Sequence, residues 1–204
     1  MKTEIRAFNF VVRAEENDEH GHFLSGRPIV YNSRTDLGWY DEIIEAGALD
    51  GTDLRDVRFL VNHNTDMIPL ARSRNNTENS TMQMTVDGEG MGIRVDLDTE
   101  NNAEAKSLYS AVSRGDISGM SFMFTVDSDA WDDIESEHPT RTIRAIGRVL
   151  EVSAVTFPAY EATSIQARGL ADALDSARAS LESERTRMKK MEQRKKAIKL
   201  LLEV

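Results

Sequence analysis

The hydrophobic periodicity of this chain of 204 residues changes once, near Gly169, and that change limits the fold more than any other feature. Residues 1–168 contain short segments in which every second residue is apolar, the pattern of β-strands. Residues 169–204 contain no proline, and their apolar positions recur in steps of four and three, as in a heptad helix. We therefore expect a mainly β body over residues 1–168 and a helical tail over residues 169–204.

The body is expected to consist mainly of strands. Apolar residues occupy alternate positions from Val57 to Val61, and His63 continues the series, so a strand would place these side chains on one face. Residues 82–86 and 91–97 flank a turn that contains glycine, which predicts a β-hairpin. These patterns favour an α+β protein that is mainly β.

A helix and an acidic loop are predicted after the hairpin. Residues 102–114 have apolar side chains at helical spacing, and Gly115 is suited to end that helix. A strand is expected over residues 117–126, followed by a solvated acidic loop over residues 127–138. The carboxylates of this loop suit a hard cation, although the loop lacks the spacing and central glycine of an EF-hand. A cation-binding β-domain is therefore one alternative function.

Charge and hydropathy argue against nucleic-acid binding and against insertion into a membrane. The formal net charge is −10, and the tail has nine basic and six acidic residues, so the body carries the negative excess. An acidic body is unsuited to nucleic acid, because phosphate binding needs Lys and Arg. No stretch approaches the ~18 apolar residues of a membrane-spanning helix, and the first residues lack a signal-peptide pattern. We expect neither nucleic acid nor membrane as a partner.

The absence of cysteine limits the chemistry to serine, threonine, lysine or carboxylate nucleophiles. Four histidines could act as a base at neutral pH: His20, His22, His63 and His138. His20 and His22 lie in a polar, turn-like segment without a third metal ligand, so we expect no metal site there. His138 closes the acidic loop. His63 ends an apolar strand, a position that holds a side chain rigidly beside a cleft.

Ser121 and Glu151 are the candidate partners of His63. Ser121 follows Gly119 on a predicted strand, where the small neighbour lets a substrate backbone approach. Glu151 lies in an apolar run, and a buried carboxylate there is costly unless it is paired. Orienting a histidine would pair it, and so would an ion pair with Arg144 or Arg148. From the residues alone, a core histidine and a small strand serine stay open alternatives.

At these positions the sequence resembles the prohead protease family of tailed phages. The resemblance covers most of residues 1–168 and leaves the tail outside. Three positions depart from the usual family pattern, namely Asn64, Ala71 and Met123. The matching segments are Gly26-Arg27-Pro28-Ile29-Val30-Tyr31-Asn32-Ser33, residues 41–48, Val61-Asn62-His63-Asn64, residues 114–122 with Gly119-Met120-Ser121-Phe122, and residues 151–160.

The resemblance implies a fold and a set of site residues. The family is related in fold to herpesvirus maturation proteases, which implies a small closed β-barrel ringed by short helices. Ser121 carries over as the nucleophile and His63 as the base. Herpesvirus enzymes use a second histidine as third member, whereas the matching strand here offers Glu151, which we prefer to His138.

The resemblance also implies oxyanion donors, partners and a location. Backbone amides near Ala159 and Tyr160 would stabilise the oxyanion, by analogy of fold. Substrates would be the scaffold or the major capsid protein precursor, cleaved without metal or cofactor inside the prohead in the host cytoplasm. The herpesvirus relatives dimerise, which makes a homodimer an expectation. The tail lies outside this resemblance, and its heptad pattern and net positive charge lead us to expect that it binds scaffold helices. An exposed junction near Gly169 is expected to be open to self-cleavage. An inactive capsid scaffolding module is the alternative function.

Overall fold

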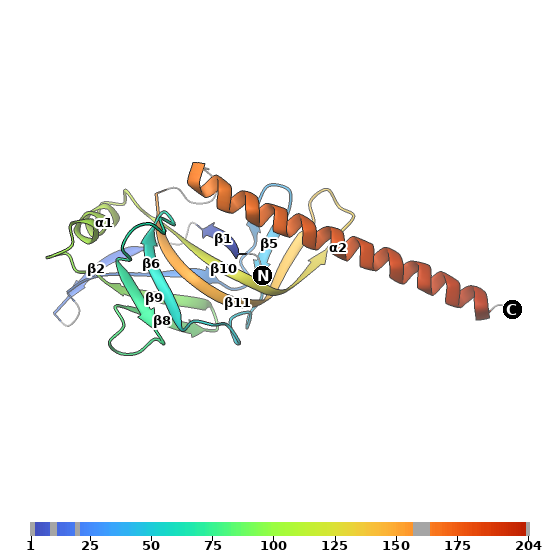
Figure 1. Cartoon of the computed structure of the whole chain (residues 1–204), viewed down its shortest axis with the longest axis horizontal. Helices are drawn as coiled ribbons and strands as arrows, with labels where there is room; N and C mark the ends of the chain where they lie inside the picture. The colour runs from blue at the N-terminus through green and yellow to red at the C-terminus, as the bar shows by residue number, and fades with distance from the viewer. Residues whose placement is uncertain (1–2, 9–11, 19–20, 157–163, 203–204) are drawn as a thin grey trace.

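The computed structural model describes residues 3–8, 12–18, 21–156 and 164–202. Strands form most of the body and two helices complete it (Figure 1). In chain order the elements are β1 (Thr3–Phe8), β2 (Arg13–Asn17), β3 (Gly21–Val30), β4 (Thr35–Asp36), β5 (Asp41–Ile44), β6 (Asp56–Val61), β7 (Ala71–Arg74), β8 (Met82–Asp87), β9 (Gly90–Asp96), α1 (Ala103–Ser113), β10 (Gly119–Asp132), β11 (Thr140–Val155) and α2 (Ser164–Leu202).

The larger of the two sheets is organised around a long antiparallel hairpin of β10 and β11. β1 pairs with the free edge of β10. On its other edge, β11 is long enough to pair in parallel with two separate strands, β5 near its start and β6 near its end. β4 and β7 extend the sheet beyond β5 and β6. This arrangement brings β6, β11, β10 and β1 side by side at the end of the hairpin opposite its turn.

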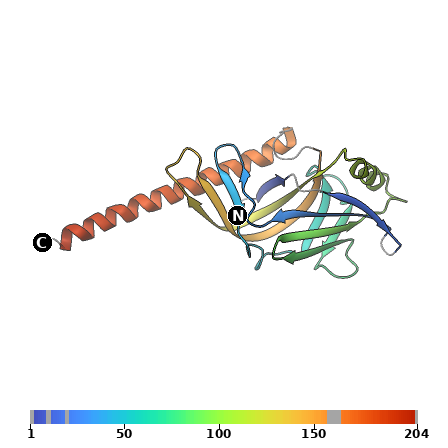
Figure 2. The same cartoon turned by 180° about the vertical axis from the view of Figure 1, so that it is seen from behind.

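The second sheet has the antiparallel order β2-β3-β9-β8 and packs on the first. Its β8–β9 hairpin confirms the prediction made from the glycine-containing turn. In Figure 2 this sheet lies on the near side and α2 on the far side. Between the two sheets lies one hydrophobic core, which includes Leu24, Ile93, Phe59, Phe122 and Val152.

The closed β-barrel that we expected is wrong, because in the described part of the chain the strands form two separate sheets. The edge between β7 and β8 shows the physical reason. The N–H groups of Arg72 and Arg74 that point away from β6 donate to the hydroxyls of Thr81 and Ser80, at 2.9 and 3.1 Å. Side-chain oxygens thus satisfy the outer edge of β7 where a barrel would need a strand ladder.

The predicted helix is confirmed as α1, and the acidic loop predicted over residues 127–138 is wrong in its first half. The side chain of Asn102 caps α1 by accepting from two backbone N–H groups, and Gly115 follows the helix with a φ of 80°. β10, however, continues to Asp132 instead of ending near residue 126. Asp129 within it is paired with Arg141 at 2.7 Å, so part of the acidic run belongs to the sheet.

The helix α2 is continuous across residue 168 and differs along its length. Ala173, Ala177 and Leu181 are buried, the last two in a cluster with Tyr40 and Trp131. From residue 186 to residue 199 the side chains are exposed, and this half projects beyond the body (Figures 1 and 2). The division of the chain at residue 168 stays a prediction. No helix among the described residues is long and apolar enough to span a membrane.

A buried ion cluster ties β1 to the rest of the sheet. Arg6 pairs with Glu4 at 2.7 Å and with both carboxylate oxygens of Glu42, and Arg141 pairs with Glu4 at 2.8 Å. All four side chains are almost completely buried, where unpaired charges would be strongly destabilising. Burial raises the pKa of the neighbouring Tyr40 to about 12. The cluster therefore joins β1, the strand that pairs with β10 beside Ser121, to β5 and β11.

Candidate active site

Ser121 lies on β10, an inner strand of the larger sheet between β1 and β11. Its backbone pairs with Ala7 on β1 and with Ser153 on β11, and the side chains of Ser121 and Ser153 share one face of the sheet. The adjacent residues Met120 and Phe122 are buried and point to the other face, in the hydrophobic core. Ser121 itself is completely buried. The alternation expected from the sequence therefore separates Ser121 from the core side chains around it.

His63 follows β6 after a sharp change in backbone direction. Asn62 and His63 have φ values of 52° and 56°, in the left-handed region that few residues other than glycine adopt. The Asn62 side chain holds this turn through two hydrogen bonds with Thr156, at 3.0 and 2.9 Å. Non-glycine residues in this region store backbone strain that the surrounding structure must offset, and such strain is frequent at functional sites. The turn brings the His63 ring back over β11.

The three predicted residues meet in one buried cluster, which we call the Ser–His–Glu cluster (Ser121, His63 and Glu151). His63 Nε2 lies 2.5 Å from Ser121 Oγ, and His63 Nδ1 contacts Glu151 Oε1. His63 is 6% exposed and Glu151 is 3% exposed. A carboxylate on Nδ1 favours the tautomer that carries its proton there, which leaves Nε2 free to accept the serine proton.

Ser153 is a fourth member that the sequence analysis missed. Its hydroxyl donates to Glu151 Oε2 at 2.6 Å and accepts from the backbone N–H of His63 at 3.1 Å. It is completely buried. The signal was present in the sequence, because Glu151 and Ser153 are two residues apart on one strand and so share a face.

The carbonyl of Arg6 on β1 is a second acceptor for the serine. Ser121 Oγ donates to this oxygen at 2.8 Å. A hydroxyl has a single proton, so Arg6 O and His63 Nε2 compete for it. The position of β1 therefore influences how much of the serine proton is shared with the histidine.

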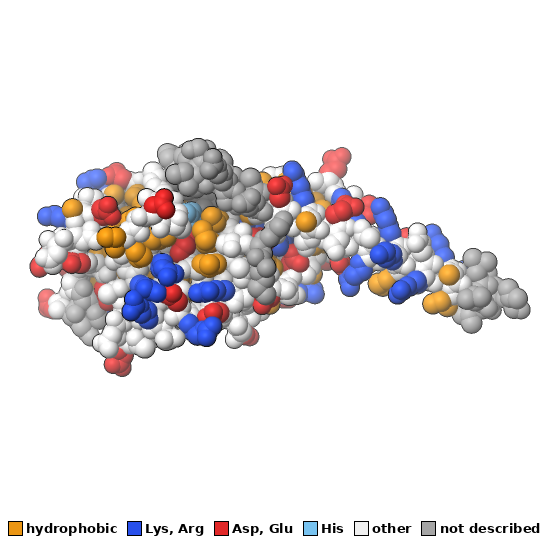
Figure 3. Space-filling model, viewed as in Figure 1, with side chains coloured by type: hydrophobic (Ala, Val, Ile, Leu, Met, Phe, Trp, Pro, Cys, Tyr) orange, Lys and Arg blue, Asp and Glu red, His pale blue; other side chains and the backbone are white. Residues whose placement is uncertain are grey.

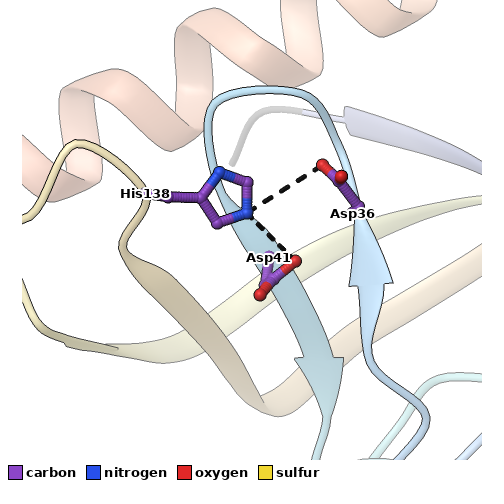
Figure 4. Close-up of side chains that lie close together, drawn as sticks. All are labelled: Asp36, Asp41 and His138. Atoms are coloured by element: carbon purple, nitrogen blue, oxygen red, sulfur yellow. Dashed lines mark ion pairs between the residues drawn. The ribbon is translucent and has the colours of Figure 1, made fainter.

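The other predicted residues lie elsewhere. His138 is close to Asp41 and Asp36, with Nε2–Oδ1 distances of 3.2 and 4.0 Å (Figure 4). It precedes the first residue of β11, and eleven residues of strand, roughly 35 Å at about 3.3 Å per residue, separate that residue from Glu151. His138 is thus remote from Ser121. The predicted oxyanion residues Ala159 and Tyr160 lie outside the described residues.

Asp36, Asp41 and His138 form the one group in the described ranges whose ligand atoms could hold a metal ion. Asp36 and His138 are exposed, and both carboxylates already have partners, since Gly38 N–H donates to Asp36 and Arg34 pairs with Asp41. Within the part of the chain that the structure describes, the acidic residues between 127 and 137 form no such group.

The comparison with protein families decides the class of protein. Residues 8–176 match the family described as caudovirus prohead serine protease. The chain belongs to this family. The prohead protease is therefore a serine peptidase of phage capsid maturation, which acts within the capsid, and an inactive scaffolding module is set aside. The match continues past residue 168 into the first part of α2.

Two further comparisons complete the description of the prohead protease. None of the curated proteins matches the chain. Among solved structures, the chain is similar to the bacteriophage T4 capsid assembly protease, gp21, with 10% sequence identity and a TM-score of 0.37. The similarity covers 76% of this chain and 99% of that structure.

Proposed function

We propose that Ser121 is the nucleophile of this prohead protease, that His63 is its general base and that Glu151 orients His63. The observation that carries this proposal is the unbroken run of contacts from Ser121 Oγ through both ring nitrogens of His63 to Glu151. This is the geometry by which serine hydrolases activate a hydroxyl, and it is recognised by the roles of the groups and not by their order in the chain.

The reaction proceeds in two halves. Ser121 Oγ attacks the scissile carbonyl carbon while His63 Nε2 takes the hydroxyl proton, and the Glu151 carboxylate stabilises the resulting imidazolium. His63 then protonates the leaving amine, the C–N bond breaks and an acyl-enzyme remains on Ser121. A water molecule gives a proton to His63 and attacks the ester, which releases the new carboxyl terminus and restores the serine. The mechanism uses no cofactor or metal ion.

The oxyanion of each tetrahedral intermediate needs hydrogen-bond donors. We place them at backbone amides near Ala159 and Tyr160, which follow β11 shortly after Glu151 in the chain. Preorganised N–H groups of this kind account for a large part of the rate enhancement in acyl transfer. The support for these two positions is the analogy of fold given by the family resemblance.

The substrates follow from the family. A capsid maturation protease acts on capsid or scaffold proteins. We propose that this chain cleaves the scaffold, or a scaffold-like extension of the major capsid protein precursor, inside an immature shell in the host cytoplasm. A homodimer is part of the proposal by analogy with the herpesvirus enzymes. Neither nucleic acid nor membrane has a role in it.

The exposed half of α2 is the proposed scaffold-binding segment. Met188, Met191 and Ile198 are 44%, 43% and 58% exposed, and basic side chains surround them. An amphipathic basic helix that projects from an acidic body is suited to pack on another helix. We also propose that the enzyme cleaves itself near Gly169. Such a cut would have to release the first half of α2 from the body, since Ala177 and Leu181 pack with Tyr40 and Trp131, and Arg185 donates to the Ile134 carbonyl.

Processing of the capsid precursor tests the proposed function. The full chain, Ser121→Ala and Ser118→Ala would each be co-expressed with the capsid precursor and scaffold of the same phage, and the products identified by mass spectrometry. Ser118 is an exposed serine three residues from Ser121 and serves as the matched control. Cleavage should be lost with Ser121→Ala alone. Processing that survives this substitution, or that is lost equally with Ser118→Ala, would contradict the assignment.

A further inference from the structure

An apolar pocket of about 450 Å³ opens at the surface between α1 and the segment that follows β6. Its volume lies within the range of about 300–1,000 Å³ that is usual for ligand pockets. Figure 3 shows hydrophobic side chains gathered at the surface over the region of α1 and β6, with a histidine beside them. The pocket is lined chiefly by Val61, Met67, Leu108, Ala111 and Ile117, with Glu104 and Ser107 as polar members.

The pocket adjoins the Ser–His–Glu cluster along the chain. Val61 comes two residues before His63, and Ile117 comes four residues before Ser121. A chain spans at most about 3.6 Å per residue, so both residues lie within roughly 15 Å of the side chains that would react. An extended peptide advances about 3.3 Å per residue. A substrate held at Ser121 can therefore reach the pocket with a side chain no more than about four residues from the scissile bond.

The composition of the pocket limits what it can bind. The half-buried Val61, Met67 and Ile117 leave apolar surface in contact with water, and Ala111 is too small to fill the space beside Leu108. Among the residues that the structure describes, no Lys or Arg lines the pocket. An acidic side chain would find no countercharge there, whereas an aliphatic or aromatic side chain would bury its surface.

Two other pockets lack these properties. One of about 760 Å³ lies on the second sheet among Arg13, Arg27, Asp87 and Arg94, and shares no residue with the segments that carry the cluster. Another of about 410 Å³, beside Arg72 and the turn after β7, is polar. The apolar pocket beside α1, which we call the α1 pocket, therefore differs from these two, because Val61 and Ile117 lie close in the chain to His63 and Ser121.

We infer that the α1 pocket is a substrate subsite that accepts one aliphatic or aromatic side chain of the cleaved protein, within about four residues of the scissile bond. The inference rests on the proposed function, because it takes Ser121 as the point of attack. α1 would then have two roles, since its buried residues Ala105, Leu108 and Val112 complete the core while Ala111 shapes the subsite. Cleavage-site preference would be set partly by a helix that contributes no residue to the cluster.

Substitution at Ala111 tests the inference, because a larger side chain would fill the pocket from a half-buried position. The full chain would be incubated with a library of proteome-derived peptides, and the cleaved bonds identified by mass spectrometry. The unmodified protease should enrich Leu, Ile, Met or Phe at one fixed position near the cut. Ala111→Phe should lower kcat/KM for such peptides by about 10–100-fold, the range expected when a hydrophobic pocket is blocked, and leave peptides with alanine there within about two-fold. Lys106→Phe adds the same ring to an exposed position of α1 outside the pocket and should leave kcat/KM unchanged for both kinds of peptide.

The outcomes separate this inference from the proposed function. Cleavage that depends on Ser121 but shows no apolar preference, or a preference unchanged by Ala111→Phe, would overturn the subsite and leave the nucleophile in place. An equal loss on all peptides with Ala111→Phe would also overturn it, because a blocked subsite affects only the side chains that occupy it. Cleavage that persists in Ser121→Ala would contradict the proposed function, and the subsite with it.

Discussion

The hydroxyl of Ser153 accepts the backbone N–H of His63 at 3.1 Å, and so holds the histidine at the point where its chain turns back over the sheet. The same hydroxyl donates to Glu151 at 2.6 Å. One small side chain thereby fixes both the base and the carboxylate that orients it, although it does not contact Ser121 through any hydrogen bond of its own. Ser153 is a positioning residue in the proposed mechanism.

Ser153→Ala should lower kcat by about 10-fold with KM almost unchanged, because a misplaced His63 affects proton transfer more than substrate binding. Loss of the hydroxyl leaves a buried N–H and a carboxylate oxygen without this partner, which should cost about 1–3 kcal/mol of stability. Steady-state kinetics on one peptide substrate, together with thermal unfolding, would measure both effects. A fall in stability with unchanged kcat would show that Ser153 acts on the fold alone.

Glu151→Gln should reduce kcat/KM by about 10³–10⁴-fold, while His138→Ala should leave it within about two-fold. An amide cannot stabilise the imidazolium as a carboxylate does, and it favours the wrong tautomer of His63. His138 is paired instead with Asp41 at the far end of the β10–β11 hairpin. Peptide hydrolysis by the two purified variants would decide between them. Greater damage from His138→Ala would assign the third position to histidine after all.

Truncation of α2 should have two distinct effects. A chain that ends at Thr186 keeps Ala177 and Leu181, which pack with Tyr40 and Trp131, and should unfold within about 2 °C of the full chain. A chain that ends at Arg168 exposes that cluster, and its melting temperature should fall by about 10 °C or more. Thermal unfolding of both chains would measure this.

The shorter truncation also tests the proposed role of the exposed half of α2. The chain ending at Thr186 should cleave peptides at the full rate and fail to enter proheads, which sedimentation of assembled shells would detect. If the full chain and the chain ending at Thr186 enter proheads equally well, residues 187–202 have no scaffold-binding role. A stable chain ending at Arg168 would restore the simple division of the protein at that position.

The buried ion cluster predicts a specific acid sensitivity. Burial alone would raise the pKa of the Glu4 carboxyl, but hydrogen bonding from Arg141 and the charges of Arg6 and Arg141 lower it below the ordinary value. A lowered pKa in the folded state means that the unfolded chain takes up protons first. The stabilisation is therefore complete above about pH 4.3, the usual value for glutamate, and is lost as the pH falls through the folded value.

Glu4→Gln should consequently flatten the dependence of unfolding free energy on pH between about pH 5 and pH 3, and should lower stability at neutral pH because Arg6 and Arg141 lose a charged partner. Denaturant unfolding at several pH values would measure this. Glu78→Gln, at an exposed position, is the control and should leave the slope unchanged. An unaltered slope in Glu4→Gln would mean that other carboxylates govern acid unfolding.

Local patterns predicted local structure well. Alternation identified β6, the glycine turn identified β8 and β9, and helical spacing with Gly115 identified α1. The meeting of Ser121, His63 and Glu151 followed from the family resemblance, because pairing between β6, β10 and β11 joins segments up to about ninety residues apart, which no local pattern encodes. The left-handed turn at Asn62 and His63 was likewise not visible, since neither residue is glycine.

Long-range features were predicted less well, for a related reason. The prediction of a closed barrel was wrong because the outer edge of β7 pairs with no further strand in the described residues. Two side-chain hydroxyls accept its backbone N–H groups instead. The predicted strand was too short, because a run of acidic residues such as Asp129 is typical of a solvated loop. The ion pair of Asp129 with Arg141 joins residues on two strands, and the local sequence does not encode it. The packing of α2 depends on Trp131 and Tyr40, whose position beside the helix is set by the sheet and not by the heptad pattern.

The central claim is that the protein attacks its substrate with Ser121 activated by His63. Labelling of the purified full chain with a small fluorophosphonate, followed by mass spectrometry of the proteolytic fragments, tests it most directly. We predict a single covalent adduct on the fragment that contains Ser121, formed at least about 100-fold more slowly in His63→Ala and absent in Ser121→Ala. An adduct on another residue, or labelling of Ser121 at an undiminished rate without His63, would contradict the account.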